Sequence, residues 1–301
     1  MTTVNLGNVG DLSKPITVFV EKIFHAAGVL WEPKQMVRIA EAEAKADMIR
    51  AIGELKVEAI KELAERTGKR FVYEELRKQY NMESIIGKAI PAIEESAKPQ
   101  DVEDDWIANF FDKCRLISDE QMQELWAKIL AGEANAPGRF SKRTVNIVAS
   151  LDRSDAEAFT TLCGFAIKIL QGHPLPLIYD SKHRIYTDNG ISFFGLTNLE
   201  SIGLIRFDTA RLFTQRTVLL IPPYAPGILA ERAMHQVPVF YYGQRVTVEL
   251  PQKEDPALIV GTVILTEPGQ QLALVCDAHP VDGFIDYCRE KWKGFGYKIE
   301  P

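Results

Sequence analysis

Apolar residues recur three and four positions apart through the first half of the chain, which predicts a succession of amphipathic helices. The first helix is expected to begin at Pro15 and to end before Pro33. A later helix is expected over Met82–Ser96, because Pro99 disfavours helical backbone in the residue before it. We therefore expect residues 1–97 to form a helical arm.

The segment from Lys34 to Tyr80 has the composition of one long helix, because it is rich in Ala, Glu, Lys and Arg and has no proline. Gly53 and Gly68 are points where this helix can bend or end. A narrow apolar stripe is not buried by one compact core, so we expect the arm to pair with itself or with another subunit. The alternative is a solvated helix that packs on its own domain. The stripe consists of Met36, Ile39, Met48, Ile52, Leu55, Ile60 and Leu63.

Trp, Phe and helix caps are concentrated in residues 98–171, which predicts a compact helical bundle. Acidic residues at 101–105 suit the first turn of its first helix, where they complement the helix dipole. Capping boxes that begin at Ser118 and Ser154 predict two further helices, of which the second extends to Ile169. We expect three aromatic residues to hold the core: Trp106, Phe110 and Trp126.

Short runs of β-branched and aromatic residues alternate with helical segments in residues 172–301, which predicts an α+β domain. A hairpin turn is expected at Tyr242–Arg245, and Thr266 is expected to cap a helix. A helix that ends at Gly203 and is followed by paired strands is typical of a winged-helix unit. The expected strands are Leu177–Tyr179, Arg184–Thr187, Leu204–Phe207, Thr217–Pro222, Pro238–Tyr242, Gln244–Leu250 and Leu258–Leu265.

The fold class expected for the whole chain is therefore α+β. A mostly helical N-terminal arm and central bundle precede a smaller α+β domain that is winged-helix-like.

Composition indicates an ordinary water-soluble protein, with 46% hydrophobic residues, 25% charged residues and a net charge of −6. This acidity argues against the overall basic field of a non-specific nucleic-acid binder. We expect no membrane-spanning segment, and the N-terminus lacks the basic region and apolar core of a signal peptide. The four widely spaced cysteines are expected to be reduced, buried thiols. We therefore expect a cytoplasmic protein.

The sequence contains no motif that identifies an enzyme: GxxxxGK[ST], GxGxxG, HExxH and GxSxG are all missing. The five histidines are scattered singly, so we expect neither a bound metal nor a cofactor. One enzymatic hypothesis remains, in which acidic residues near an arginine act as acid and base or hold a metal ion. The residues of that hypothesis are Asp104, Asp105, Asp112, Glu133 and Arg143.

The loop after Gly132 provides the best candidates for binding, because recognition favours loops on rigid scaffolds. The run from Arg139 to Arg143 places basic side chains just before a helix N-terminus, a position that favours an anion. Our candidates for contact with a partner or an anion are Glu133, Arg139, Lys142 and Arg143.

The run DDWIANFFDKCRLISDEQMQELWAKILAGEANAPGRFSKRT, from Asp104 to Thr144, resembles the core of a bacterial family, domain of unknown function 2806. The segments Glu32–Ala46, Leu199–Ile205 and Gly261–Leu272 are similar to that family too. The resemblance covers nearly the whole chain from Ser13, but it implies little biochemistry, because the family has no established activity that can be assigned to residues of this chain.

A second resemblance concerns two shorter segments, Leu125–Ala131 and Ser150–Ala156. Their pattern is similar to that of the alpha family of abortive-infection proteins. This similarity implies a role in bacterial antiphage defence and no particular mechanism.

The function that we expect is that of a non-enzymatic interaction or sensor protein. It would form a homo-oligomer through its N-terminal helices and contact another protein. The alternative is a nucleic-acid-binding protein that uses the C-terminal winged-helix-like unit. A third hypothesis is a metal-assisted hydrolase at the acidic helix start.

Overall fold

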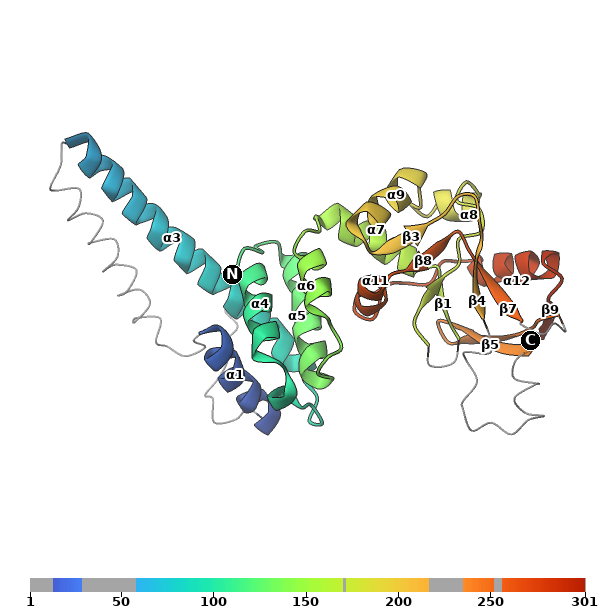
Figure 1. Cartoon of the computed structure of the whole chain (residues 1–301), viewed down its shortest axis with the longest axis horizontal. Coiled ribbons are helices and arrows are strands. Elements are labelled where there is room, and N and C mark those ends of the chain that lie inside the picture. Colours follow the sequence, from blue (N-terminus) through green and yellow to red (C-terminus); the bar gives the residue numbers. More distant parts are fainter. Residues whose placement is uncertain (1–12, 29–57, 170–171, 217–234, 252–255, 301) are drawn as a thin grey trace. The chain divides into compact units, whose positions relative to one another are not determined.

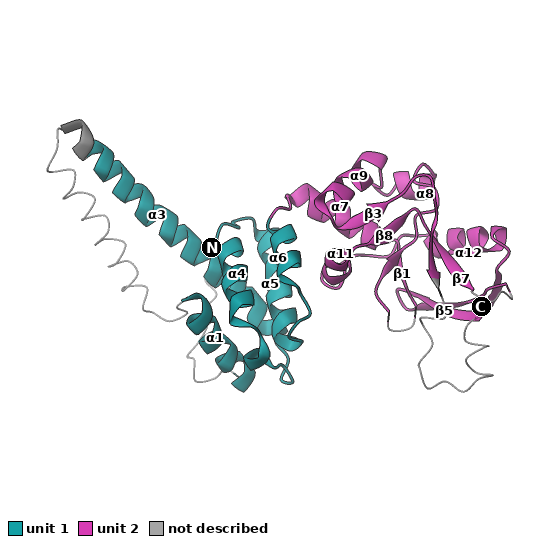
Figure 2. Ribbon diagram, viewed as in Figure 1, with its two compact units in different colours: residues 1–149 teal, residues 150–301 magenta. Residues whose placement is uncertain are grey.

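The computed structural model describes residues 13–28, 58–169, 172–216, 235–251 and 256–300 (Figure 1). They form an α+β protein that divides into two compact units, residues 1–149 and 150–301 (Figure 2). The predicted arm between Lys34 and residue 57, and the predicted strand Thr217–Pro222, lie outside the described residues.

Unit 1 is helical in its described part, because its apolar residues follow the helical repeat. Its core lies where α1, α3, α4, α5 and α6 pack together. The elements are α1 (Lys14–Ala27), α3 (Glu58–Ala89), the 3₁₀ turns η2 (Ile90–Ala92) and η3 (Pro99–Asp101), α4 (Asp104–Cys114), α5 (Glu120–Asn135) and α6 (Lys142–Val148).

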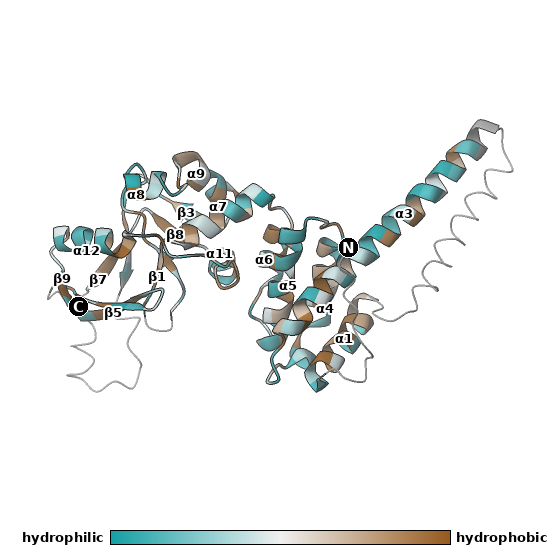
Figure 3. Cartoon of the chain, turned by 180° about the vertical axis from the view of Figure 1, so that it is seen from behind, coloured by the Kyte–Doolittle hydropathy of each residue, from teal (hydrophilic) through white to brown (hydrophobic). Residues whose placement is uncertain are grey.

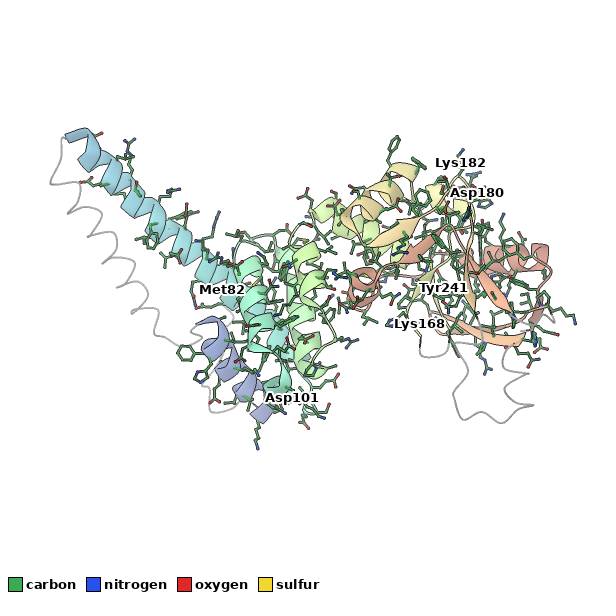
Figure 4. The ribbon with its side chains drawn as sticks, in the orientation of Figure 1. Met82, Asp101, Lys168, Asp180, Lys182 and Tyr241 are labelled. Carbon is green, nitrogen blue, oxygen red and sulfur yellow. The ribbon has the colours of Figure 1, made fainter. Side chains whose placement is uncertain are left out.

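Helix α3 passes through Asn81 without a break, so the prediction of a separate helix from Met82 was wrong. The Asn81 side chain explains the continuity, because it is buried and bonded across to the segment between α4 and α5. Its Nδ2 donates to the carbonyl oxygen of Arg115 at 3.0 Å and to Oγ of Ser118 at 3.1 Å. Met82, labelled in Figure 4, follows it into the packed end of α3. Asn81, which was interpreted as the end of a helix, therefore attaches α3 to the segment between α4 and α5.

The aromatic core of unit 1 is confirmed, because Trp106, Phe110 and Trp126 are all buried. The rings of Trp106 and Phe110 stack with centroids 5.1 Å apart, and Phe110 meets Trp126 edge to face at 5.0 Å. Such pairs contribute about 0.5–1.5 kcal/mol each beyond the burial of their surface. The second pair, Phe110 with Trp126, fixes α4 against α5.

The helix caps differ slightly from the prediction, because aspartates replace the expected serines. Asp119 caps α5 by accepting the N–H of Met122 at 2.9 Å. Ser118 lies one residue before the cap, and its hydroxyl accepts from Asn81. Asp152, paired with Asp155, caps α7 (Arg153–Cys163) in place of Ser154.

Unit 2 combines short helices with antiparallel strands. Its helices are α7 (Arg153–Cys163), α8 (Arg184–Thr187), α9 (Phe193–Ile202), α11 (Glu267–Leu272) and α12 (Phe284–Gly294). Its strands are β1 (Ala166–Ile169), β2 (Leu175–Pro176), β3 (Ile205–Phe207), β4 (Phe213–Arg216), β5 (Gln236–Tyr241), β6 (Gln244–Glu249), β7 (Ala257–Gly261), β8 (Val263–Leu265) and β9 (Lys298–Glu300).

Two local predictions in unit 2 named the wrong type of element, and the strand expected at Leu177–Tyr179 is only an isolated bridge at Ile178. The helix expected to reach Ile169 ends at Cys163, and the apolar run after it is strand β1. The strand expected at Arg184–Thr187 is the helical turn α8, which His183 caps by accepting the N–H of Ile185. Both runs are short, and a short apolar run does not distinguish helix from strand.

The strands of unit 2 pair mostly over long distances in the sequence. The main sheet has the order β2-β1-β5-β6-β9, and two smaller sheets pair β3 with β8 and β4 with β7. The β5–β6 hairpin is confirmed, and its two-residue turn, Tyr242 and Gly243, has φ values of 43° and 88°. The two strands that follow Gly203 directly, β3 and β4, pair with β8 and β7 and not with each other, so they do not form the local hairpin expected of a winged-helix unit.

Candidate functional site

The loop between α5 and α6 is organised by the buried carboxylate of Glu133, one of the predicted contact residues. The side chain is only 3% exposed. Its Oε1 accepts the N–H of Gly138 at 2.6 Å and its Oε2 accepts the N–H of Phe140 at 2.8 Å. Burial raises the pKa of Glu133 above its usual value, and this effect outweighs the stabilisation of the carboxylate by the loop N–H groups. Glu133 therefore holds the loop through a carboxylate that is buried in this structure.

The end of the same loop is fixed by Phe140. Its carbonyl oxygen accepts the indole N–H of Trp106 at 2.6 Å, and its ring lies directly against Gly132. Ser141 then caps α6 by accepting the N–H of Thr144 at 3.2 Å. The loop is thus a rigid support for the side chains that project from it.

The three basic candidates, Arg139, Lys142 and Arg143, are exposed. Lys142 forms an ion pair with Asp105, with 3.6 Å between Nζ and Oδ2. Such an exposed pair contributes little stability and does not remove the lysine from the surface. Together the three residues form a basic edge beside the loop, separate from the buried carboxylate of Glu133.

The acidic residues of the enzymatic hypothesis are not brought together. Asp104 pairs with Lys22 at 3.5 Å, and Asp105 pairs with Lys142. Asp112 forms ion pairs with Lys113 and Arg115, at the C-terminal end of α4. The hydrogen bond from Lys113 is the main reason that the pKa of Asp112 is lowered. Within the described ranges, no three His, Cys, Asp or Glu side chains gather as a metal site would require.

Sequence reasoning missed a row of exposed side chains on α3: Tyr73, Leu76 and Tyr80. Their exposed fractions are 67%, 47% and 70%. They lie three and four residues apart and so share one face, opposite the buried face of the same helix. That buried face consists of Met82, Ile85, Ile86 and Ala89. The spacing is visible in the sequence, but only the structure shows that this face is not the one that packs.

Figure 3 shows α3 as a largely hydrophilic helix in which apolar positions are scattered. Large apolar side chains in a row on such a helix are unusual, because an exposed helix face normally carries charged residues. We call Tyr73, Leu76 and Tyr80 the α3 stripe.

Unit 2 contains an open cavity of about 380 Å³ near α8 and α9. Lys182, labelled in Figure 4, is the one charged residue among those that line it, and the other polar groups are hydroxyls. No acid–base pair stands in this lining, so the cavity adds no catalytic candidate. The lining residues are Ser181, Lys182, Thr187, Gly190, Ile191, Ser192 and Phe193.

Among the helices of the described ranges, none is both long and apolar enough to cross a membrane.

Comparison with known proteins gives one match. The model of a family described as "Protein of unknown function (DUF2806)" matches residues 65–288, from within α3 to within α12. A search of curated proteins and a search of solved structures found no match. Because the family match covers more than half of the sequence and spans both units, the chain belongs to the DUF2806 family.

Proposed function

We propose that the protein is a non-enzymatic interaction protein whose subunits assemble through the α3 stripe. The observation that carries this proposal is the exposure of Tyr73, Leu76 and Tyr80 on one face of a helix that packs through its opposite face. The bundle holds the C-terminal part of α3 in place, since Asn81, Met82, Ile85 and Ile86 are buried. The stripe is therefore presented by a supported helix.

Burial of the stripe would contribute substantially to association. Complete burial of a large apolar side chain contributes about 1.5–3 kcal/mol, so covering half to two thirds of one contributes roughly 1 kcal/mol. Three such side chains from each of two copies supply roughly 6 kcal/mol. Substitution of the stripe would thus weaken association by several factors of ten.

The charges around the α3 stripe favour a second copy of this chain as the partner. Lys69, Tyr73, Leu76, Tyr80 and Glu83 follow one another at alternating spacings of four and three residues, which is the repeat of a coiled-coil seam. Lys69 and Glu83 are equally distant from Leu76. In an antiparallel pair centred on Leu76, Lys69 of each copy would therefore lie opposite Glu83 of the other.

Sedimentation of the full chain over a wide concentration range tests the proposal. The test variant combines Tyr73→Ser, Leu76→Ser and Tyr80→Ser, and the matched control is Phe194→Ser, which changes an apolar side chain that is 84% exposed on α9. We expect the unaltered chain and the control to sediment as a dimer or larger assembly and the triple variant as a single subunit. Circular dichroism confirms that the helix content is retained. A single subunit for the unaltered chain, or an unchanged assembly for the triple variant, would refute the proposal.

We include a role in bacterial antiphage defence in this proposal. It is supported by the pattern of Leu125–Ala131 and Ser150–Ala156. Plaque counts on a bacterial host that expresses the chain should be lower than on a host that expresses the triple variant. Equal counts across a broad panel of phages would contradict the defence role without affecting the assembly.

A further inference from the structure

Cys163 and Cys276 are distant in the sequence and adjacent in unit 2. Cys163 is the last residue of α7, and Cys276 lies in the segment that follows α11. Thr160, one turn before Cys163, donates its hydroxyl to the carbonyl oxygen of Cys276 at 3.2 Å. On the other side, the backbone at Gly164 passes so close to His279 that a Cβ atom at Gly164 would lie 2.7 Å from its carbonyl oxygen.

Tyr241, labelled in Figure 4, joins the same two segments. Its hydroxyl donates to the carbonyl oxygen of Gly164 at 2.8 Å and accepts the N–H of Val281 at 2.6 Å. The backbones that carry Cys163 and Cys276 are therefore fastened together on both sides of the two thiols.

The side chains of the two thiols interact, and the Cys276 thiol also donates to the carbonyl oxygen of Ala273, with 3.8 Å between sulfur and oxygen. Asp277, directly after Cys276, has a φ of 49°, in the left-handed region that a non-glycine residue rarely adopts. The interaction with Cys163 is the main cause that lowers the pKa of Cys276, and the same interaction, together with burial, raises the pKa of Cys163.

The two sulfurs differ in their access to solvent. Cys163 is buried and 4% exposed, whereas Cys276 is half-buried. Asp277 and His279, beside Cys276, are exposed. A small oxidant thus reaches Cys276 first, and Cys163 lies behind it as the second thiol.

We propose that Cys163 and Cys276 form a reversible oxidative modification site whose oxidising substrate is a hydroperoxide. The Cys276 thiolate attacks one peroxide oxygen, the O–O bond breaks, and the departing hydroxide takes up a proton to leave as water. The resulting Cys276 sulfenic acid is attacked by the sulfur of Cys163, which loses its thiol proton as a second water departs. Two thiols and hydrogen peroxide thereby give one disulfide and two waters, with two electrons transferred to the peroxide.

The other two cysteines provide an internal comparison. Cys114 and Cys288 are fully buried, and burial raises the pKa of both thiols. A buried thiol with a raised pKa has little thiolate and reacts slowly. The site is therefore confined to the pair.

The experiment treats the full chain with hydrogen peroxide, alkylates the remaining thiols in denaturant, and measures the intact mass and the peptides. We expect the number of alkylated thiols to fall from four to two, with a Cys163–Cys276 cross-linked peptide that dithiothreitol removes. In Cys163→Ala the sulfenic acid at Cys276 should persist and react with dimedone. In Cys276→Ala no cross-link should form, whereas Cys288→Ala should retain it.

Retention of four alkylated thiols after treatment would overturn the proposal. So would a cross-link that involves Cys114 or Cys288 in place of the proposed pair, or dimedone labelling of Cys276 that is no stronger in Cys163→Ala than in the unaltered chain. Circular dichroism of each variant shows whether it folds, and the unaltered chain answers the first question without any substitution.

Discussion

Replacement of Glu133 by alanine tests whether this buried carboxylate holds the loop between α5 and α6. The substitution removes the acceptors of the Gly138 and Phe140 N–H groups, which lie 2.6 and 2.8 Å from the two carboxylate oxygens. Alanine has no acceptor, so at least the buried N–H of Phe140 would lose its hydrogen-bond partner. We therefore expect the loop and the start of α6 to loosen.

The expected cost follows from two opposing effects. A hydrogen bond to a charged group contributes about 1.5–3 kcal/mol, and two are lost. Burial of the carboxylate costs free energy in the unaltered protein and so offsets part of the contribution of these two hydrogen bonds, as the raised pKa of Glu133 indicates. We expect Glu133→Ala to lower the free energy of unfolding by about 2–4 kcal/mol.

The pH dependence has a definite sign. Because the pKa of Glu133 is raised in the folded protein, its stabilising contribution is complete below the usual value of 4.5 and falls as pH rises through the folded pKa. The difference between the unaltered chain and Glu133→Ala should therefore be larger below pH 4.5 than at neutral pH. Glu133→Gln, which stays neutral and keeps one acceptor oxygen, should cost less than Glu133→Ala.

Urea unfolding followed by circular dichroism at both pH values provides the measurement. A cost of Glu133→Ala below about 0.5 kcal/mol would be that of an ordinary surface substitution and would refute the role of the carboxylate. A difference that grows as pH rises would refute the sign of the argument.

Three further substitutions test the packing in the same urea assay. Gly132→Ala places a Cβ atom 2.7 Å from Cε2 of Phe140 and should cost about 1–3 kcal/mol; an unchanged unfolding midpoint would show that the ring moves freely. Trp106→Phe leaves the buried carbonyl oxygen of Phe140 without its indole donor and should cost about 1–3 kcal/mol, whereas a stabilised variant would contradict that bond. Gly261→Ala combines a φ of 111° with a clash against the carbonyl oxygen of Ile178 and should cost more than about 2 kcal/mol; a neutral effect would exclude this close approach.

The helical core of unit 1 could be predicted from the sequence because its signals are local. Trp106, Phe110 and Trp126 lie at helical spacing, and they are buried as predicted. Asn81 shows where local signals fail. Its amide favours a helix end when read alone, but in the structure it bonds to Arg115 and Ser118, which lie far along the chain.

The sheets of unit 2 could be predicted only as individual strands and one hairpin. The turn at Tyr242 and Gly243 joins two strands that are consecutive in the sequence, so the residues of the turn are enough to predict the hairpin. The partner of β3 is β8, and more than fifty residues separate the two strands, so no local pattern identifies the pair. The pairing of Cys163 with Cys276 was not predicted for the same reason.

The exposure of the candidate residues was predicted in part. The sequence indicated that the loop around Glu133 is important and that Arg139, Lys142 and Arg143 are available for contacts, and the structure shows these three side chains exposed. It did not indicate that Glu133 is buried, because the bonds that compensate its burial come from backbone N–H groups. Residue type alone carries no information about such bonds.

Cross-linking at the centre of the α3 stripe tests assembly through this helix most directly. In an antiparallel pair centred on Leu76, the two copies of this residue face each other, so Leu76→Cys should give a disulfide-linked dimer under mild oxidation. Leu116→Cys, at a position that is 57% exposed outside the stripe, serves as the control and should give none. A covalent dimer from Leu76→Cys alone is the predicted result; equal cross-linking of both variants, or of neither, would contradict assembly through the stripe.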